Sequence, residues 1–209
     1  MKPTIIGRSS SHFTRVTRIF AAELGVEHGF EVVRDLAALE PAAYGGNPAL
    51  RVPALETADG TWFGALNVCR ELNRRAARGV RVVWPEALAQ ATAANAQELT
   101  LQAMANEVTL ITASMGGVSE ASPFRAKVHE GLVNTLAWLE RNLDGALAAL
   151  PSEPRASYLE VTLYCLLTHL EFRGIAPTAP YPRLTAFCGE YGARPSVERT
   201  PYRFDAPAP

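Results

Sequence analysis

The hydrophobic positions in the first third of the chain follow two different periods. Residues 4–6 and 30–33 are short apolar runs of strand length, and between them every third or fourth residue is apolar. The second spacing places side chains on one face of a helix, and its positions are Phe13, Val16, Phe20 and Leu24. The pattern therefore predicts a strand, a helix and a second strand, which together form a βαβ unit.

Two more strands and a helix are predicted after this unit. Residues 51–55 and 62–63 are rich in apolar side chains, and Asp59-Gly60 between them is typical of a tight hairpin turn. Val68 and Leu72 then begin a helical spacing. The order β-α-β, a linking segment and β-β-α is the thioredoxin-like arrangement, a mixed sheet with antiparallel last strands. We expect this α/β domain over residues 1–79.

Near residue 85 the strand signals end and long helical patterns begin. After Val128, leucines hold one helix face at positions 132, 136, 139, 143 and 147, and a second face at 159, 163, 166 and 170. Residues 157–160 read Ser-Tyr-Leu-Glu, the S-x-x-E form of a capping box, which marks the start of the second of these helices. We therefore expect a second domain, an all-helical bundle, over residues 86–205.

Composition narrows the class of protein. The 209 residues carry 20 Lys and Arg against 21 Asp and Glu, a formal charge of −1, which argues against a protein that coats nucleic acid or an anionic membrane. Hydrophobic residues make up 48%, as in chains that bury a core. We find no run of about 18 apolar residues and no secretory signal pattern. We expect a soluble, cytoplasmic protein with no nucleic-acid or membrane partner.

The cysteines and histidines do not group into a metal site. Cys69, Cys165 and Cys188 are an odd number without C-x-x-C spacing, and the four histidines show no H-E-x-x-H spacing. We expect neither a disulfide framework nor a bound metal.

Four segments resemble motifs of the cytosolic glutathione transferase family, in the order of that family. Ser11-His12-Phe13, with Arg15 and Arg18 after it, is similar to S-P-F-x-R-x-x-R. Residues 47–55, NPALRVPAL, are similar to N-P-x-x-K-V-P-x-L. The third segment is the capping box, and the fourth is YPRL at 181–184 with RPSV at 194–197. The resemblance spans the chain and implies the glutathione transferase fold, glutathione as co-substrate, a small electrophile as second substrate, and a homodimer.

The resemblance implies that a hydroxyl at the start of the first helix holds the glutathione sulfur as a thiolate. Ser11 matches the family position, with Ser9 and Ser10 as alternatives, and His12 and Phe13 complete this part of the glutathione site. His12 replaces the usual proline, so it is either a titratable ring beside the thiol or an exposed histidine without a role. The other interpretation of Ser11 is a helix N-cap without chemistry.

The loop before the third strand is the second contact that the resemblance implies. In the family the bond matching Val52-Pro53 is cis, and the valine backbone pairs with the cysteinyl part of glutathione. A trans proline at a strand start is the alternative. Arg51 either reaches the glycyl carboxylate of glutathione or stays in solvent.

The third contact departs from the family pattern. Counting back from Leu72, the usual Glu-Ser pair, which holds the γ-glutamyl ammonium and carboxylate groups, corresponds to Gly64 and Ala65. Both functional side chains are missing, so the backbone amides of Ala65 and Leu66 are left to hold the carboxylate at a helix N-terminus. Asn67 is the nearest polar substitute for the partner of the ammonium group.

Two further groups receive roles through the resemblance. One wall of the electrophile pocket is expected from a charge-poor helix, over residues 87–114, that also builds the dimer interface; its pocket residues are Met104, Glu107, Val108 and Ile111. Arginines at 70, 74, 75, 78 and 81 make a basic stretch. This stretch is a solvated face, an inter-subunit ion-pair surface, or a region that steers anionic glutathione.

Three functions are open at this point. We favour a glutathione transferase that conjugates the thiolate of glutathione to an apolar electrophile. The second is a non-catalytic binding or interaction module with weak or no glutathione binding, because Gly64 and Ala65 lack the usual side chains. The third, a glutathione-dependent thiol reductase, needs a cysteine at or beside Ser11, and the sequence has none there.

Overall fold

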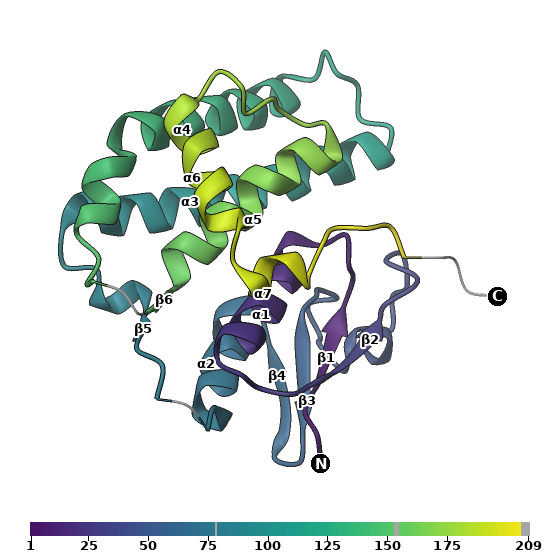
Figure 1. Ribbon diagram of the computed structural model, residues 1–209. Coiled ribbons are helices and arrows are strands. Elements are labelled where there is room, and N and C mark those ends of the chain that lie inside the picture. Colours follow the sequence, from purple (N-terminus) through teal and green to yellow (C-terminus); the bar gives the residue numbers. More distant parts are fainter. Residues whose placement is uncertain (78, 153–154, 206–209) are drawn as a thin grey trace. The chain divides into compact units, whose positions relative to one another are not determined.

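The computed structural model describes residues 1–77, 79–152 and 155–205 (Figure 1). Contacts divide the chain into two compact units, Met1–Arg81 together with the segment from Ala193 onward, and Val82–Gly192. This division differs from the expected ranges 1–79 and 86–205 chiefly because residues 193–205 lie with the first unit.

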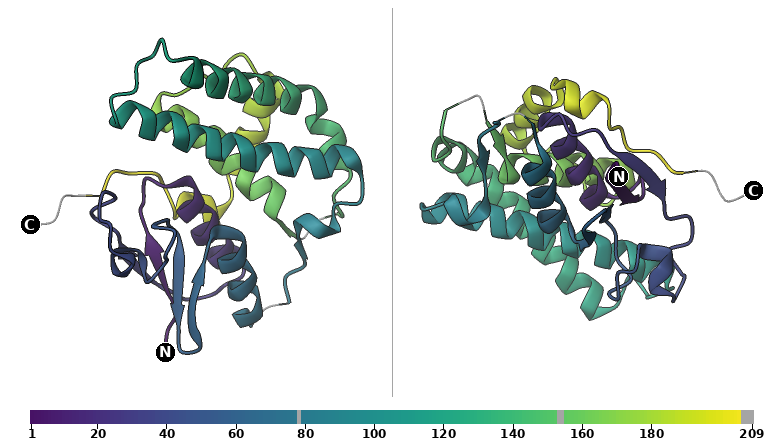
Figure 2. Two further views of the ribbon diagram at one scale, coloured as in Figure 1. Left: turned by 180° about the vertical axis from the view of Figure 1, so that it is seen from behind. Right: turned by 90° about the horizontal axis from the view of Figure 1, so that it is seen from below.

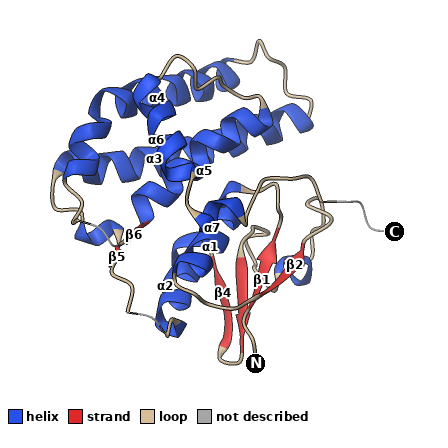
Figure 3. Cartoon of the chain, viewed as in Figure 1, coloured by secondary structure: helices blue, strands red, loops and turns tan. Residues whose placement is uncertain are grey.

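The first unit is a four-stranded mixed sheet with helices. Its strands are β1 (Thr4–Gly7), β2 (Gly29–Val32), β3 (Ala54–Thr57) and β4 (Gly60–Phe63), in the order β2-β1-β3-β4. β1 and β2 are parallel, and the other two pairings are antiparallel. The helical elements are α1 (His12–Glu23), the short 3-10 helix η1 (Pro41–Tyr44), α2 (Ala65–Arg75) and α7 (Pro195–Glu198). This confirms the predicted thioredoxin-like arrangement (Figure 3).

Both faces of this sheet are covered. Ile5 and Leu55 are completely buried, and α1 and α2 contact each other and the strands (Figure 2). Successive strand residues point to opposite faces, so Ile6 and Ala54 face the other way. There they form a buried cluster with Tyr44 of η1. The sheet is therefore a rigid central layer for the loops at its ends.

The second unit is a helical bundle with one small addition. Its helices are α3 (Ala91–Met115), α4 (Pro123–Ala148), α5 (Tyr158–Arg173), α6 (Pro182–Gly192) and the 3-10 helix η2 (Pro85–Ala87). The expectation of helices alone is wrong at one place. β5 (Val82–Val83) and β6 (Ala156–Ser157) form a parallel pair, and two-residue strands are too short to show an alternating pattern.

α5 is the central helix of this unit. Twelve of its 16 residues are buried, whereas α4 buries one face, which includes Leu132, Leu136, Leu139 and Leu143 as the leucine spacing predicts. The α5 N-cap is Ser157, whose Oγ accepts from the Glu160 amide at 3.4 Å. The Glu160 carboxylate also accepts from Arg155 Nη2 at 3.0 Å, so an ion pair lies beside the predicted cap.

Candidate functional site

Three predicted segments meet at one edge of the sheet in the first unit. Ile6 pairs with Ala54, and Ala54 pairs with Phe63. Because β3 is antiparallel to both β1 and β4, the end of β1, the start of β3 and the end of β4 lie at the same edge. The segments that leave or enter the sheet there are residues 8–13, 51–53 and 64–66. We call this group of segments the α1–α2 edge.

The N-terminus of α1 presents the serine hydroxyls. Ser11 is the N-cap, and its Oγ accepts from the Thr14 amide at 3.2 Å. An oxygen that accepts in this way keeps its own proton for donation to another group. Ser9 is 2% exposed, and its Oγ has no hydrogen-bond partner among the described residues. Ser11 is half-buried, so it is the better placed of the two to contact a ligand.

His12 and Phe13 follow as the first residues of α1. His12 is 1% exposed, and its ring meets the Phe13 ring edge-on, with 4.5 Å between centroids. The interpretation of His12 as an exposed histidine is therefore wrong, because its ring takes part in the packing at the helix start. Phe13 keeps part of its surface exposed.

The loop before β3 is held by its own side chains. The Val52-Pro53 bond is cis, as predicted. Asn47 Nδ2 donates to the Arg51 carbonyl at 2.8 Å, and Asn47 Oδ1 accepts from the Ala49 amide at 3.0 Å. The Arg51 side chain is exposed, and Val52 is half-buried. β3 begins only at Ala54, so Val52 precedes the strand ladder.

The N-terminus of α2 completes the edge. Its N-cap is Gly64, which has φ 82° and makes no side-chain cap. The first intrahelical bond runs from the Val68 amide to the Gly64 carbonyl at 2.9 Å, and the Gly64 amide donates to the Pro53 carbonyl at 3.1 Å. The amides of Ala65 and Leu66 precede that first bond, and the first amides of a helix have no partner within it. They offer an anion two or more donors at the positive end of the helix dipole.

Comparison with known proteins identifies this unit. The family model of the glutathione S-transferase N-terminal domain matches residues 10–75, which hold nearly all of the α1–α2 edge. Residues 10–75 are therefore similar to a glutathione S-transferase N-terminal domain. A comparison with the curated proteins found no match.

Solved glutathione transferases share the fold of the whole chain. One from Methylobacterium radiotolerans, in complex with glutathione sulfonate, has a TM-score of 0.77 and 18% identity, over 100% of this chain and 99% of that one. One from Methylobacillus flagellatus, with glutathione bound, has a TM-score of 0.78 and 19% identity, over 96% and 100%. A Drosophila melanogaster glutathione transferase has a TM-score of 0.73 and 19% identity, over 98% and 100%. These structures confirm the predicted fold, and the family match agrees with the resemblance over residues 10–75.

The basic stretch of this unit is partly neutralised. Glu71 is buried and accepts from Arg74 Nε at 2.7 Å and Arg75 Nε at 2.6 Å. Arg75 Nη2 also lies 2.5 Å from Asp59 Oδ2, and hydrogen bonds to Asp59 and then Glu71 raise the pKa of Arg75. Arg75 therefore ties α2 to the β3–β4 turn, whereas the ion pair of Arg74 with Glu71 lies within α2. Arg78, a member of the predicted stretch, lies outside the described residues.

The four residues expected to line the electrophile pocket all lie on α3. Met104 and Glu107 are completely buried, and Glu107 Oε1 lies 2.7 Å from Nδ1 of His169 on α5. A side chain without exposed surface offers no contact to a ligand, so these two are not carried into the proposed site. Val108 and Ile111 are half-buried and remain candidates.

Two concave regions of the described structure lie elsewhere. One, of about 410 Å³, lies at the C-terminal end of α1 between Lys2, Arg18 and His28. The other, also about 410 Å³, lies beside Glu171 and Thr178. Neither lining includes a predicted site residue. Across the described residues, no helix combines the length and the apolar character needed to cross a membrane.

Proposed function

We propose that this protein is a glutathione transferase that binds glutathione at the α1–α2 edge and joins its thiolate to an apolar electrophile. The observation that carries the proposal is the pairing of two donors at one edge of a glutathione S-transferase N-terminal domain. These are the Ser11 hydroxyl, which has a proton left to donate, and the α2 N-terminus, which has no capping side chain. The donors present fit the thiol and the γ-glutamyl carboxylate of glutathione.

The chemical task of the site is to keep the glutathione sulfur as a thiolate, which is the reactive nucleophile. Lowering a thiol pKa by about 2 units takes about 2.7 kcal/mol of differential stabilisation. A hydrogen bond to a charged group contributes about 1.5–3 kcal/mol. One O–H donor at Ser11, aided by the N-terminal dipole of α1, therefore supplies the required magnitude. The thiolate then attacks the electrophile and forms the thioether bond as the leaving group departs. In an addition, it bonds to one carbon of the acceptor double bond, and the other carbon takes a proton from water.

The remaining contacts orient the tripeptide. The Val52 backbone, ahead of the β3 ladder, pairs with the cysteinyl group in the manner of an added strand. The amides of Ala65 and Leu66 hold the γ-glutamyl carboxylate, and the exposed Arg51 reaches the glycyl carboxylate. Phe13 and His12 pack at the thiol end. Val108 and Ile111 belong to the wall of the electrophile pocket, and we propose no metal in the reaction.

The γ-glutamyl ammonium group lacks the glutamate that usually holds it. Loss of one charge-assisted hydrogen bond weakens binding by about tenfold or more. We therefore expect a glutathione Kd near the millimolar range. The same gap at Gly64 and Ala65 favours the second candidate function, a non-catalytic module that keeps the fold for a protein partner. By the family resemblance we also propose a homodimer in the cytoplasm.

Titration calorimetry of the purified protein with reduced glutathione, up to about 10 mM, tests the proposal, because a millimolar Kd corresponds to about −4 kcal/mol. Saturable heat supports the transferase and leads to a screen of electrophiles. The absence of both binding heat and a rise in melting temperature at 10 mM refutes the proposal in favour of the interaction module. A Leu66→Pro variant is the matched control, because proline removes one of the two amides proposed to hold the carboxylate and is tolerated in the first turn of a helix.

A further inference from the structure

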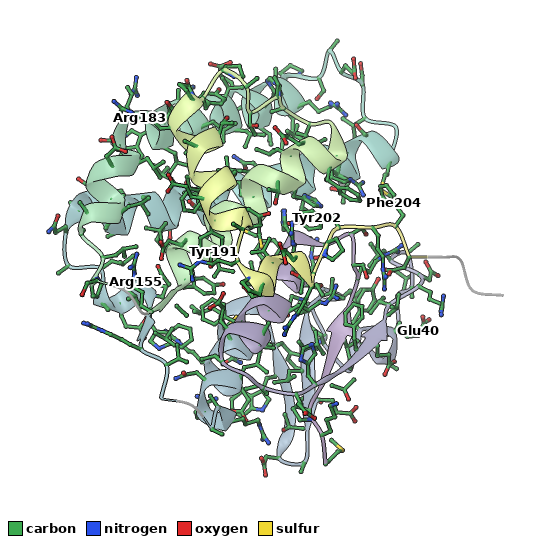
Figure 4. All side chains as sticks on the ribbon, in the orientation of Figure 1. Glu40, Arg155, Arg183, Tyr191, Tyr202 and Phe204 are labelled. Carbon is green, nitrogen blue, oxygen red and sulfur yellow. The ribbon has the colours of Figure 1, made fainter. Side chains whose placement is uncertain are left out.

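The segment after residue 192 runs along α1 from its C-terminal end to its N-terminal end. Glu23, the last residue of α1, accepts from Ser196 Oγ at 2.5 Å and lies 3.7 Å from Arg194 Nη1. At the fourth residue of α1, the Arg15 guanidinium lies 4.3 Å from the centre of the Tyr202 ring. Figure 1 shows the segment, in yellow, beside α1, and Figure 4 labels Tyr202 on it.

The segment reaches the α1–α2 edge at Asp205. The Ser9 amide donates to Asp205 Oδ2 at 2.8 Å, and the Asp205 side chain is 6% exposed. Arg203 Nε lies 3.9 Å from the other carboxylate oxygen. A buried bond between an amide and a carboxylate is short and charge-assisted, and bonds of this kind are about twice as strong as neutral ones.

This bond holds the turn that carries the serines. The Ser11 amide donates to the Arg8 carbonyl at 3.1 Å, so residues 8–11 form a tight turn with Ser9 inside it. Ser9 is therefore fixed through its amide, while Ser11 begins the helix at the other end of the turn. The position of the Ser11 hydroxyl depends on both ends. Arg8, which opens the turn, is held by its amide on Thr14 Oγ1 at 3.4 Å and by Nη1 on the Arg34 carbonyl at 3.2 Å. Ser9 itself is held by the bond from its amide to Asp205.

We propose that Asp205 is a positioning residue, which holds the Ser9–Ser11 turn so that the Ser11 hydroxyl points at the glutathione sulfur. This inference rests on the proposed function and extends it, because it places a contribution to the thiol site 196 residues away in the sequence. The carboxylate does not touch glutathione. It acts through the Ser9 amide, and an uncharged acceptor in the same place retains most of the effect.

Three variants separate positioning from simple loss of charge. Asp205→Ala removes the acceptor, Asp205→Asn keeps an oxygen acceptor without the charge, and Glu198→Ala removes an exposed carboxylate from the same segment as a matched control. We expect Asp205→Ala to lower kcat about tenfold with a change in glutathione KM of about twofold at most, because a bond to a charged group is lost. Asp205→Asn recovers at least half of that loss on a logarithmic scale, and Glu198→Ala matches the unmodified protein.

Amide hydrogen exchange tests the same bond without any substrate. Exchange at Ser9 should become at least about tenfold faster in Asp205→Ala than in the unmodified protein, while amides within β1 keep their rates. Unchanged exchange at Ser9 overturns the proposal, as does an equal fall in kcat for Asp205→Asn and Asp205→Ala. If the unmodified protein neither binds nor turns over glutathione, the proposed function fails, and the exchange rates alone decide whether Asp205 holds the turn.

Discussion

The double role of Ser11 can be separated by the choice of replacement. Ser11 Oγ accepts from the Thr14 amide as the N-cap of α1, and in the proposed function its O–H donates to the thiolate. Alanine removes both roles, threonine keeps both, and aspartate keeps only the acceptor, because an ionised carboxylate has no proton to donate. Aspartate is also among the best N-cap residues.

The expected magnitudes follow from these two bonds. Loss of the cap in Ser11→Ala costs about 1 kcal/mol, which lowers Tm by about 2–4 °C in a protein of this size. Loss of the donor costs about 1.5–3 kcal/mol of thiolate stabilisation, which raises the pKa of the bound thiol by about 1–2 units. Ser11→Asp should therefore keep the melting temperature within about 1 °C. It should lose at least as much thiolate as Ser11→Ala, because its negative charge also disfavours the thiolate.

The measured quantity is the pKa of the glutathione thiol in the complex. Ultraviolet difference absorbance of saturated complexes, followed from pH 5 to pH 9, gives the pKa of the bound thiol without knowledge of the electrophile. The reasoning is refuted if Ser11→Asp titrates like the unmodified protein, because thiolate formation would then follow the cap and not the donated proton. Ser11→Thr, which retains the hydroxyl, is the control for the shape of the turn.

Three further outcomes follow from other parts of the structure. Gly64→Glu supplies a carboxylate for the ammonium group of glutathione, so we expect a roughly tenfold lower Kd by calorimetry, and an unchanged Kd would contradict the assignment of this position. Because Gly64 has φ 82°, the same change should cost about 1–2 kcal/mol of stability in urea unfolding. Leu136→Ala opens a cavity at a completely buried site on α4 and should cost about 2–5 kcal/mol, whereas Leu147→Ala, at a half-buried position, should cost less. Burial lowers the pKa of His28 below its usual 6.5, and this effect exceeds the rise caused by its hydrogen bond to the Val26 carbonyl. As pH drops, the unfolded chain therefore takes up the proton first, and the stability of the fold falls from about pH 6.5 through the folded pKa. His28→Gln should flatten this fall between pH 7.5 and pH 5.5, and equal slopes in the two proteins would refute the reasoning.

Whether a feature of this structure can be predicted depends on how far apart in the sequence its interacting residues lie. The strand and helix periods of the first unit, the leucine faces of α4 and α5 and the Ser157 cap are local features, and all of them appear in the sequence. The strands β5 and β6 are not predicted, because a strand of two residues is too short to show an alternating pattern. The bond from Ser9 to Asp205 joins residues 196 apart, and no local pattern marks such a pair.

In the candidate site, the sequence likewise predicts the positions of residues but not the burial of their side chains. Motif spacing predicts Ser11 and the α2 N-terminus as site residues, because it fixes where a residue stands along an element. Motif spacing does not fix burial. Met104 and Glu107, which we expected in the pocket wall, are both completely covered. The φ of Gly64 gives a physical reason for the missing glutamate, since a side chain is strained in that conformation.

The first unit is discontinuous, and this orders the events of synthesis on the ribosome. Residues 82–192 form a contiguous stretch, so the helical unit is complete in sequence when residue 192 has left the exit tunnel. The sheet unit, although its strands are made first, waits for α7, Tyr202 and Asp205 to reach α1. A fragment cut after residue 81 therefore lacks the outer covering of α1 and the carboxylate at Ser9, and the half of the protein translated first is the half finished last.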